Sequence, residues 1–312
     1  MIQAKDLSKN FDDFQAVDGI NLEVGQGEVL ALLGPNGAGK TTTVRMLTSV
    51  LRPTGGSARV AGYDVVTHPA QVRSSVGVLT EHHGLYDRME SGEYLEFFGE
   101  IYEMGKEERK RRIDELLERF GLAAARGRRI GEYSKGMRQK LALARSLIHK
   151  PPVLLLDEPT SAMDPESARL VRDAIKDLQT DERSVVICTH NLVEAEELAD
   201  RIAIIRHGKI IAQGVPDQLK TELLGPPVFE LAFKSSLNGN TPELPKEVDV
   251  LEKGKDWLRF ISTKPLETNT AVLKRVLDQG YEISRLSEVP RSLEEVYLQA
   301  VLIAANKEKN HG

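Results

Sequence analysis

The sequence predicts an α/β fold built around a parallel sheet, and three observations support this. A short apolar run over residues 28–33 leads into a glycine-rich loop, and an amphipathic segment reaching about Val50 follows it. Two further apolar runs, 153–156 and 185–188, have the continuous hydrophobicity of central strands that are covered on both faces. A long stretch with helical periodicity, 91–150, precedes the first of these two strands, as an insert in an α/β domain would.

The glycine-rich loop matches the pattern G-x-x-x-x-G-K-[ST] at every fixed position. Its glycines allow backbone N–H groups to face phosphate oxygens, and the start of the next helix adds partial positive charge. Lys40 is placed to reach the β- and γ-phosphates, and the Thr41 hydroxyl is placed to hold Mg²⁺. A chance glycine loop is the alternative, but the flanking strand and helix favour a nucleoside triphosphate site. Its predicted nucleotide-binding residues are Gly34, Pro35, Asn36, Gly37, Ala38, Gly39, Lys40, Thr41 and Thr42.

Composition limits the other classes of function. With 312 residues, 40% hydrophobic and 29% charged, the chain can form one large globular domain and a small one. The net charge of -5 argues against a general nucleic-acid binder. The single cysteine, Cys188, can form neither an internal disulfide nor a cysteine-rich zinc site. We expect no secretion, because the N-terminus lacks a charged-then-apolar signal, and no apolar run approaches the roughly 18 residues of a membrane span.

Two domains are expected, with a boundary at the Gly-Pro-Pro segment 225–227. The first covers residues 1–224, with a helical subdomain at about 85–150. The second covers 225–305 and mixes strands with helices, and residues 306–312 form a polar, disordered tail. The expected strands are 2–4, 20–24, 28–33, 57–60, 76–79, 153–156, 185–188, 202–205, 210–212, 228–233, 248–251, 257–261 and 282–286. Helices are expected after the glycine loop, within 91–150, from Asp164 to about Leu178, at 270–279 and from the capping box Ser292/Glu295 onward.

Two acidic residues end the apolar strand at 153–156. Asp157 is placed to hold Mg²⁺, directly or through water, and Glu158 to activate a water for attack on the γ-phosphate. The alternative for Glu158 is a second Mg²⁺ ligand without a role as base. Upstream, Ser134 and Gly136 stand at a helix start, where a hydroxyl and N–H groups can face an anion, although taken alone the segment is better explained as a simple helix cap.

Taken together, the order of these motifs resembles the ATP-binding subunit of ABC transporters. The glycine loop, Ser134-Lys135-Gly136, Asp157-Glu158-Pro159-Thr160, the segment from Ser161 to Asp164 and Thr189-His190 carry the resemblance, which covers residues 1 to about 220. It implies a core of RecA type, that is a P-loop NTPase, with an antiparallel β subdomain, a helical subdomain and a small C-terminal α+β domain. In that family two domains bind head to tail, with each ATP between one P-loop and the signature loop of the other copy.

The resemblance also assigns roles to single residues. Ser134 and Gly136 would contact the γ-phosphate bound to the partner, and His190 would hold the γ-phosphate and the attacking water. Asp164 would belong to the loop that crosses the dimer. Phe11 matches the aromatic residue that stacks on adenine, with a core aromatic as the alternative.

Two positions depart from the family pattern. The signature, usually Leu-Ser-Gly-Gly-Gln, begins here at Tyr133 and carries Lys135 in place of the first glycine, but it keeps the serine and the second glycine. Glu81 stands where the family has a glutamine that links Mg²⁺ and water to the membrane subunit, and it retains an oxygen ligand. His82 and His83 follow it without the matching ligands that a metal site needs.

The segment after residue 225 resembles the tail of drug-resistance and export-type ABC ATPases, so the expected function is ATP hydrolysis that powers an exporter. The expected partners are a membrane permease on a separate chain, docked at about 81–98, and a second copy or a paralogous ATPase. The chain would then lie peripherally on the cytoplasmic face of the membrane. The alternative is a soluble ABC-type ATPase acting on nucleic acid or ribosomes, against which the single cassette, the short 81–134 stretch and the lone cysteine weigh. A regulatory subunit that binds ATP without hydrolysis is disfavoured, because Glu158 and His190 are both present.

Overall fold

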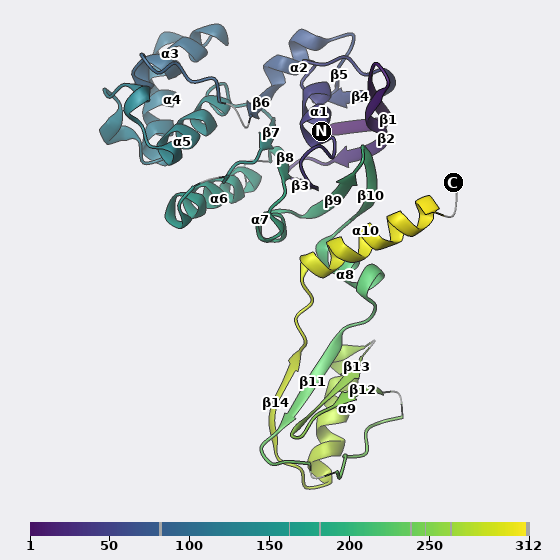
Figure 1. Ribbon diagram of the computed structural model, residues 1–312. Helices are drawn as coiled ribbons and strands as arrows, with labels where there is room; N and C mark the ends of the chain where they lie inside the picture. Colours follow the sequence, from purple (N-terminus) through teal and green to yellow (C-terminus); the bar gives the residue numbers. More distant parts are fainter. Residues whose placement is uncertain are drawn as a thin grey trace. The chain divides into compact units, whose positions relative to one another are not determined.

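The structure is a computed structural model that describes residues 1–80, 83–161, 163–180, 182–237, 239–246, 248–262 and 264–309. The chain divides into two compact units, residues 1–216 and residues 217–306 (Figure 1). Each unit has its own sheets and its own hydrophobic core. We therefore treat the two units separately.

The first unit is built on a six-stranded sheet in the order β10-β9-β3-β8-β7-β6. Five neighbouring strands run parallel, and β10 is antiparallel at one edge. Their bounds are β3 (Val29–Leu33), β6 (Val76–Leu79), β7 (Val153–Asp157), β8 (Ser184–Thr189), β9 (Arg201–Arg206) and β10 (Lys209–Gly214). Strands β3, β7 and β8 are buried along their whole length, which explains their continuous apolar sequences. Because parallel strands end at the same edge, the segments after β3, β7 and β8 meet there.

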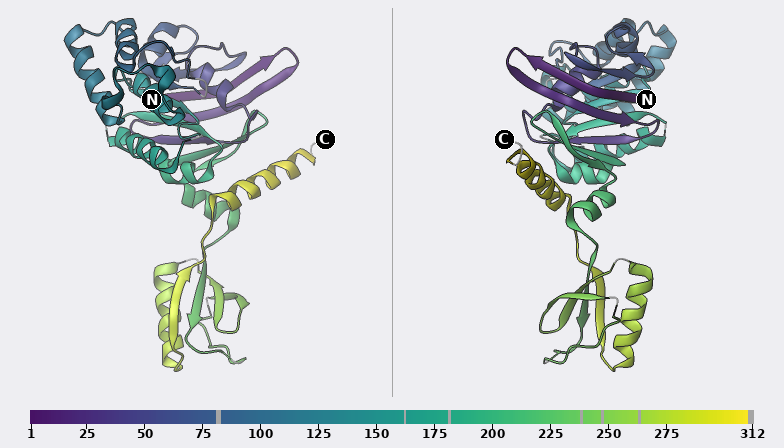
Figure 2. Two further views of the ribbon diagram at one scale, coloured as in Figure 1. Left: turned by 60° about the vertical axis from the view of Figure 1, so that its left-hand side comes forward. Right: turned by 90° about the vertical axis from the view of Figure 1, so that its right-hand side faces the viewer.

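A four-stranded antiparallel sheet, in the order β2-β1-β4-β5, forms the β subdomain. Its strands are β1 (Ile2–Phe11), β2 (Phe14–Val24), β4 (Gly55–Val60) and β5 (Tyr63–Asp64). The first two strands form the long hairpin that stands out in both views of Figure 2. Both strands are longer than the sequence predicts. Several bulges interrupt the alternation of buried and exposed side chains in the polar half of β1, so that half does not show the sequence pattern of a strand.

Seven helices and two 3₁₀ turns complete the described part of the first unit. They are α1 (Lys40–Leu47), α2 (Pro69–Ser75), α3 (Ser91–Ile101), α4 (Lys106–Arg119), η1 (Ala123–Ala125), η2 (Ile130–Glu132), α5 (Lys135–Ser146), α6 (Pro165–Thr180) and α7 (Leu192–Leu198). Helices α3, α4 and α5 gather into the helical subdomain expected at about 85–150 (Figure 1).

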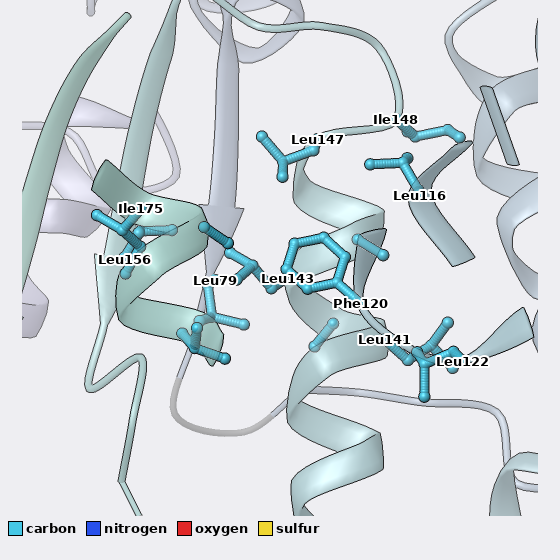
Figure 3. Close-up of a cluster of buried hydrophobic side chains, with 14 of the residues drawn as sticks. Leu79, Leu116, Phe120, Leu122, Leu141, Leu143, Leu147, Ile148, Leu156 and Ile175 are labelled. Atoms are coloured by element: carbon cyan, nitrogen blue, oxygen red, sulfur yellow. The ribbon is translucent and has the colours of Figure 1, made fainter. Parts of the chain in front are cut away.

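One hydrophobic cluster joins the helical subdomain to the sheet. Its side chains come from α4 and α5, from the sheet strands β6 and β7, and from α6 (Figure 3). Phe120 is fully buried, and it faces Leu143 of α5 across the cluster. The labelled members are Leu79, Leu116, Phe120, Leu122, Leu141, Leu143, Leu147, Ile148, Leu156 and Ile175. This packing fixes α5, and so the signature residues at its start, against the strand that carries Asp157.

The second unit contains a four-stranded antiparallel sheet in the order β12-β13-β11-β14, with α9 packed along it (Figure 2). Its elements are β11 (Val228–Phe233), β12 (Asp249–Lys253), β13 (Trp257–Ile261), α9 (Pro265–Asp278), β14 (Ile283–Glu288) and α10 (Leu293–Lys309), together with most of α8 (Pro216–Leu224). Its core is formed by apolar side chains of the strands, including Leu231 and Phe260, and by Val272 and Val276 of α9.

Three boundaries differ from the sequence-based expectation. The second unit starts before residue 225, because α8 precedes the Gly-Pro-Pro segment. Helix α9 starts at Pro265 instead of 270, since proline at a first helical position suits a helix start. Helix α10 continues to Lys309, so the first residues of the expected tail are helical. The capping box at its start is present, with Ser292 N donating to Glu295 Oε2 (2.9 Å) and Glu295 N donating to Ser292 Oγ (3.2 Å).

Candidate functional site

The glycine-rich loop joins β3 to α1, and its shape explains two of its glycines. A Cβ atom on Gly34 would lie 2.3 Å from the Ile205 carbonyl oxygen. Gly39 has φ = +110°, and a Cβ atom there would lie 2.7 Å from the Ala16 carbonyl oxygen. Neither position tolerates a side chain, so the loop wraps closely against neighbouring backbone. Lys40 Nζ folds back and donates to the carbonyl oxygens of Gly34 (2.6 Å) and Pro35 (3.1 Å).

Two predicted metal ligands meet next to this loop. Thr41 Oγ1 donates to Asp157 Oδ2 at 2.9 Å, although the two residues come from motifs far apart in the sequence. Asp157 ends the buried strand β7 and is itself only 4% exposed. A hydroxyl and a carboxylate oxygen are the hard ligands that Mg²⁺ prefers, so the donor set fits this ion. Among the described residues no group of three or more histidine, cysteine or acidic side chains could hold a metal ion.

Glu158, the predicted base, and His190, which the resemblance predicts to hold the γ-phosphate, form a direct pair. Glu158 Oε1 accepts from His190 Nδ1 at 2.7 Å and from the His190 backbone N–H at 3.1 Å. The Glu158 backbone N–H in turn donates to Cys188 O at 2.8 Å, which ties the end of β7 to β8. Glu158 has φ = +52°, a conformation that costs energy for a residue with a side chain. Strain at this position, beside a phosphate-binding loop, is typical of a residue held for function.

These groups line one cavity of about 240 Å³. Its walls come from the glycine loop and α1, the ends of β7 and β8, and the β1–β2 hairpin. The lining residues are Phe14, Ala16, Pro35, Asn36, Gly37, Gly39, Lys40, Thr41, Thr42, Asp157, Glu158, Ser161 and His190. The structure therefore brings together the P-loop, the carboxylates and the histidine that the sequence predicts, while Gly34 and Ala38 do not line the cavity.

The aromatic residue in this cavity is Phe14, which the sequence analysis did not select. Phe11, the predicted adenine partner, is paired with Phe14 across the two-residue turn of the hairpin. Cross-strand partners lie on the same face of a sheet, so both side chains belong to one face of the hairpin. Lys9 Nζ lies 5.1 Å from the centre of the Phe11 ring. Phe14 could have been identified from the register of the hairpin, but the irregular sequence of β1 conceals that register.

The signature residues lie elsewhere in the same unit. Ser134 caps α5 by accepting from Met137 N at 3.2 Å. A Cβ atom on Gly136 would lie 3.7 Å from Asp164 Oδ2, so these two predicted residues are neighbours. Asp164 accepts from Ser167 N at 2.9 Å, and this backbone hydrogen bond lowers the pKa of its carboxyl. None of Ser134, Gly136 and Asp164 belongs to the cavity lining given above.

Two more expectations concern the segment after β6. Glu81, a predicted Mg²⁺ ligand, and His82 lie outside the described residues. His83 is described, and its Nδ1 lies 2.8 Å from Thr80 O. Burial lowers the pKa of the His83 imidazole. Of the helices that the structure describes, none has the length and apolar character needed to cross a membrane.

A second residue that the sequence analysis missed is Gln139, one turn into α5. It is 5% exposed, and its Nε2 donates to Pro159 O (2.8 Å) and to Glu158 O (3.3 Å). The signature helix is therefore bonded to the backbone of the turn that carries Glu158. These two partners are backbone carbonyl groups, which leave no trace in the sequence.

A glycine loop between a parallel strand and a helix, with a strand-end acidic pair beside it, defines the class of P-loop nucleoside triphosphatases. Comparison with known proteins then identifies the family. The family model described as "ABC transporter" matches residues 17–161. The daunorubicin resistance ATP-binding protein DrrA3 of Streptomyces coeruleorubidus is 38% identical over 93% of this chain and 92% of its own length. The ABC transporter ATP-binding protein NatA of Bacillus subtilis is 41% identical over 70% of this chain and 91% of its own length.

Solved structures agree with these relatives. An ATP-binding subunit of an ABC transporter is similar, with a TM-score of 0.68, 27% identity and coverage of 72% of this chain and 94% of that one. A dimeric bacterial ABC transporter cassette has a TM-score of 0.65, 25% identity and coverage of 69% and 98%. The chain belongs to the ABC transporter family as an ATP-binding subunit, and its enzymatic activity is ATP hydrolysis. None of the relatives named here carries a name connected with nucleic acid or ribosomes.

Proposed function

We propose that this chain powers an exporter by working as one of a head-to-tail pair of ATPases that drives a separate membrane subunit. The observation that carries the proposal is the separation of two half-sites within one unit. The cavity holds the P-loop and the Glu158–His190 pair, whereas Ser134 and Gly136 lie outside it. In a head-to-tail pair, the cavity of each copy faces the Ser134 and Gly136 segment of the other copy. ATP binding then closes the pair, and hydrolysis reopens it.

In this proposal the P-loop amides and Lys40 bind the phosphates, and Phe14 with its neighbour Phe11 contacts the adenine ring. Thr41 and Asp157 would hold Mg²⁺, with Glu81 proposed as a third ligand. When bound, the ion neutralises charge on the β- and γ-phosphates. The Thr41 and Asp157 side chains are already hydrogen-bonded to each other at 2.9 Å, so binding the ion would need little movement of these two residues.

Glu158 is proposed to accept a proton from the water that attacks the γ-phosphate. His190 holds one carboxylate oxygen of Glu158 through two N–H groups, which orients the carboxylate within the cavity. Because His190 also lines the cavity, it can meet the γ-phosphate when ATP is bound. From the partner, Ser134 and the N–H groups at the start of α5 would face the same phosphate, with Asp164 beside them.

The membrane subunit is proposed to dock on the helical subdomain within about 81–98. Tyr86 and Phe97 are large side chains exposed in this region, at 50% and 40%. Their rings meet edge to face with centres 6.1 Å apart, and Phe97 also packs on Phe98. A chain that uses this patch would lie at the cytoplasmic face of the membrane. The relatives named for daunorubicin resistance support drug efflux as the transport process.

The test of the proposed chemistry is Glu158→Gln. The amide oxygen can still accept from His190, but an amide cannot take a proton from water, so hydrolysis should fall by about 10²–10⁴-fold. ATP binding by the P-loop should persist, and the variant should form stable dimers only with ATP, measured by light scattering after size exclusion. Lys40→Ala serves as the control that binds ATP poorly and stays monomeric. Unchanged phosphate release by Glu158→Gln rules out the assigned base.

A further inference from the structure

Glu194 is a buried carboxyl that the chemistry above does not use. It lies in the first turn of α7, is only 2% exposed, and follows the His190 segment closely in the chain. The sequence gives it no role beyond an acidic residue at a helix start. A carboxyl is costly to bury unless it has hydrogen-bond partners, so the partners indicate why this residue is there.

Those partners come from the two segments that carry the proposed catalytic pair. Thr160 Oγ1, in the turn after Glu158, donates to Glu194 Oε1 at 2.6 Å. The Thr189 side chain, immediately before His190, also hydrogen-bonds to Glu194. Burial raises the pKa of the Glu194 carboxyl, and these two hydrogen bonds oppose the rise. One side chain thus ties the segment after β7 to the end of β8.

The turn after β7 needs such support. Glu158 holds its positive φ only if the surroundings fix it, because the relaxed backbone avoids this region. Gln139 holds the turn through two carbonyl oxygens, and Glu194 holds it through the Thr160 hydroxyl. Loss of either contact frees the turn to relax, and the Glu158 carboxylate would then shift relative to His190.

We propose that Glu194 is a positioning residue for ATP hydrolysis, which sets the spacing of Glu158 and His190 by bridging Thr160 and Thr189. The inference rests on the proposed role of Glu158 as base. A displacement of about 1 Å in a reacting group lowers the rate by about 100-fold. ATP affinity depends on the P-loop, and the hydrogen bonds of Glu194 to Thr160 and Thr189 do not involve the P-loop. Substitution of Glu194 should therefore leave the ATP affinity unchanged.

The first test is the steady-state kinetics of Glu194→Ala. We expect kcat to fall by about 10- to 100-fold with an unchanged KM for ATP. Glu194→Gln should restore most of kcat, because hydroxyl partners can either donate to or accept from an amide. Glu196→Ala removes an exposed carboxyl from the same helix and should behave like the wild type.

Thr160→Val supplies an independent answer even if Glu194→Ala does not fold, because it removes one hydroxyl and keeps the size of the side chain. It should reproduce the loss in kcat. In the Glu158→Gln background, Glu194→Ala should cause no further loss, because the base is already absent. If Glu194→Ala and Thr160→Val both have the wild-type kcat while Glu158→Gln is inactive, the positioning role of Glu194 is refuted and the role of Glu158 as base stands. Full activity of Glu158→Gln overturns the proposed base instead.

Discussion

Gly136 offers the sharpest test of a site shared between two copies. It is the second residue of α5, with Ser134 as the cap, and a Cβ atom there would lie 3.4 Å from Ser167 Oγ, in ordinary contact. Gly136→Ala therefore fits the monomer and should stabilise it by about 0.5–1 kcal/mol through helix propensity. Gly136→Asp places a carboxylate in the first turn, where the helix dipole favours it but Asp164 opposes it, because Asp164 Oδ2 would lie 3.7 Å from the added Cβ atom.

The two variants should differ most when a nucleotide arrives from the partner. A carboxylate about 4 Å from one phosphate charge is repelled by about 4 kcal/mol at an effective dielectric of 20, which corresponds to about a 10³-fold loss in dimer affinity. A single Gly136→Asp chain should still bind ATP with the wild-type Kd, because the cavity does not include this residue.

The assay combines ATP titration of the monomer with dimerisation in the Glu158→Gln background. Analytical ultracentrifugation would give the dimer Kd for Gly136→Asp, with Gly136→Ala as the size control. Reduced ATP affinity of the Gly136→Asp monomer would place the signature helix next to its own P-loop. Unchanged ATP-dependent dimerisation of Gly136→Asp would refute the trans arrangement.

Three further predictions concern stability and nucleotide affinity. Phe120→Ala should lower the free energy of unfolding in urea by about 3–5 kcal/mol, because the ring is fully buried; a cost below about 1 kcal/mol would contradict the packing. Burial lowers the pKa of His149 to about 4, so the folded state resists its protonation. The stability that neutral His149 contributes is complete above pH 6.5 and is lost as the pH falls toward 4, by up to about 3 kcal/mol. His149→Phe should therefore lose less unfolding free energy than the wild type between pH 7 and 5.5. Equal slopes of unfolding free energy against pH for the two proteins would argue against this. Phe14→Ala should weaken ATP binding by about 10-fold in competition titrations, more than Phe11→Ala does, and the opposite order would return the adenine contact to Phe11.

Local motifs account for most of what could be predicted from the sequence. The glycine loop and the apolar strand ending at Asp157 are contiguous patterns, each tied to one element, so their meeting at one sheet edge follows from parallel topology. Ser134 and Asp164 were also predictable as helix caps, because capping depends on a few adjacent residues.

Contacts between distant segments were not predictable in the same way. Phe14 lines the cavity because of a hairpin register that bulges in β1 obscure. Gln139 bonds to carbonyl oxygens, and backbone atoms carry no sequence signature. Glu194 reads as an ordinary acidic residue in a first helical turn, and only tertiary structure shows that its carboxyl points at Thr160.

The most direct test of the proposed transport function is purification of the tagged chain from its own membranes, after gentle extraction, beside a Phe97→Asp variant. We predict that the wild type brings down a polytopic membrane protein in stoichiometric amount. Phe97→Asp should lose this partner and keep its ATP-dependent dimer, since Phe97 lies on the exposed aromatic patch and outside the cavity. A soluble dimer that carries ribosomes or nucleic acid instead would contradict the transport function and leave only the ATPase chemistry.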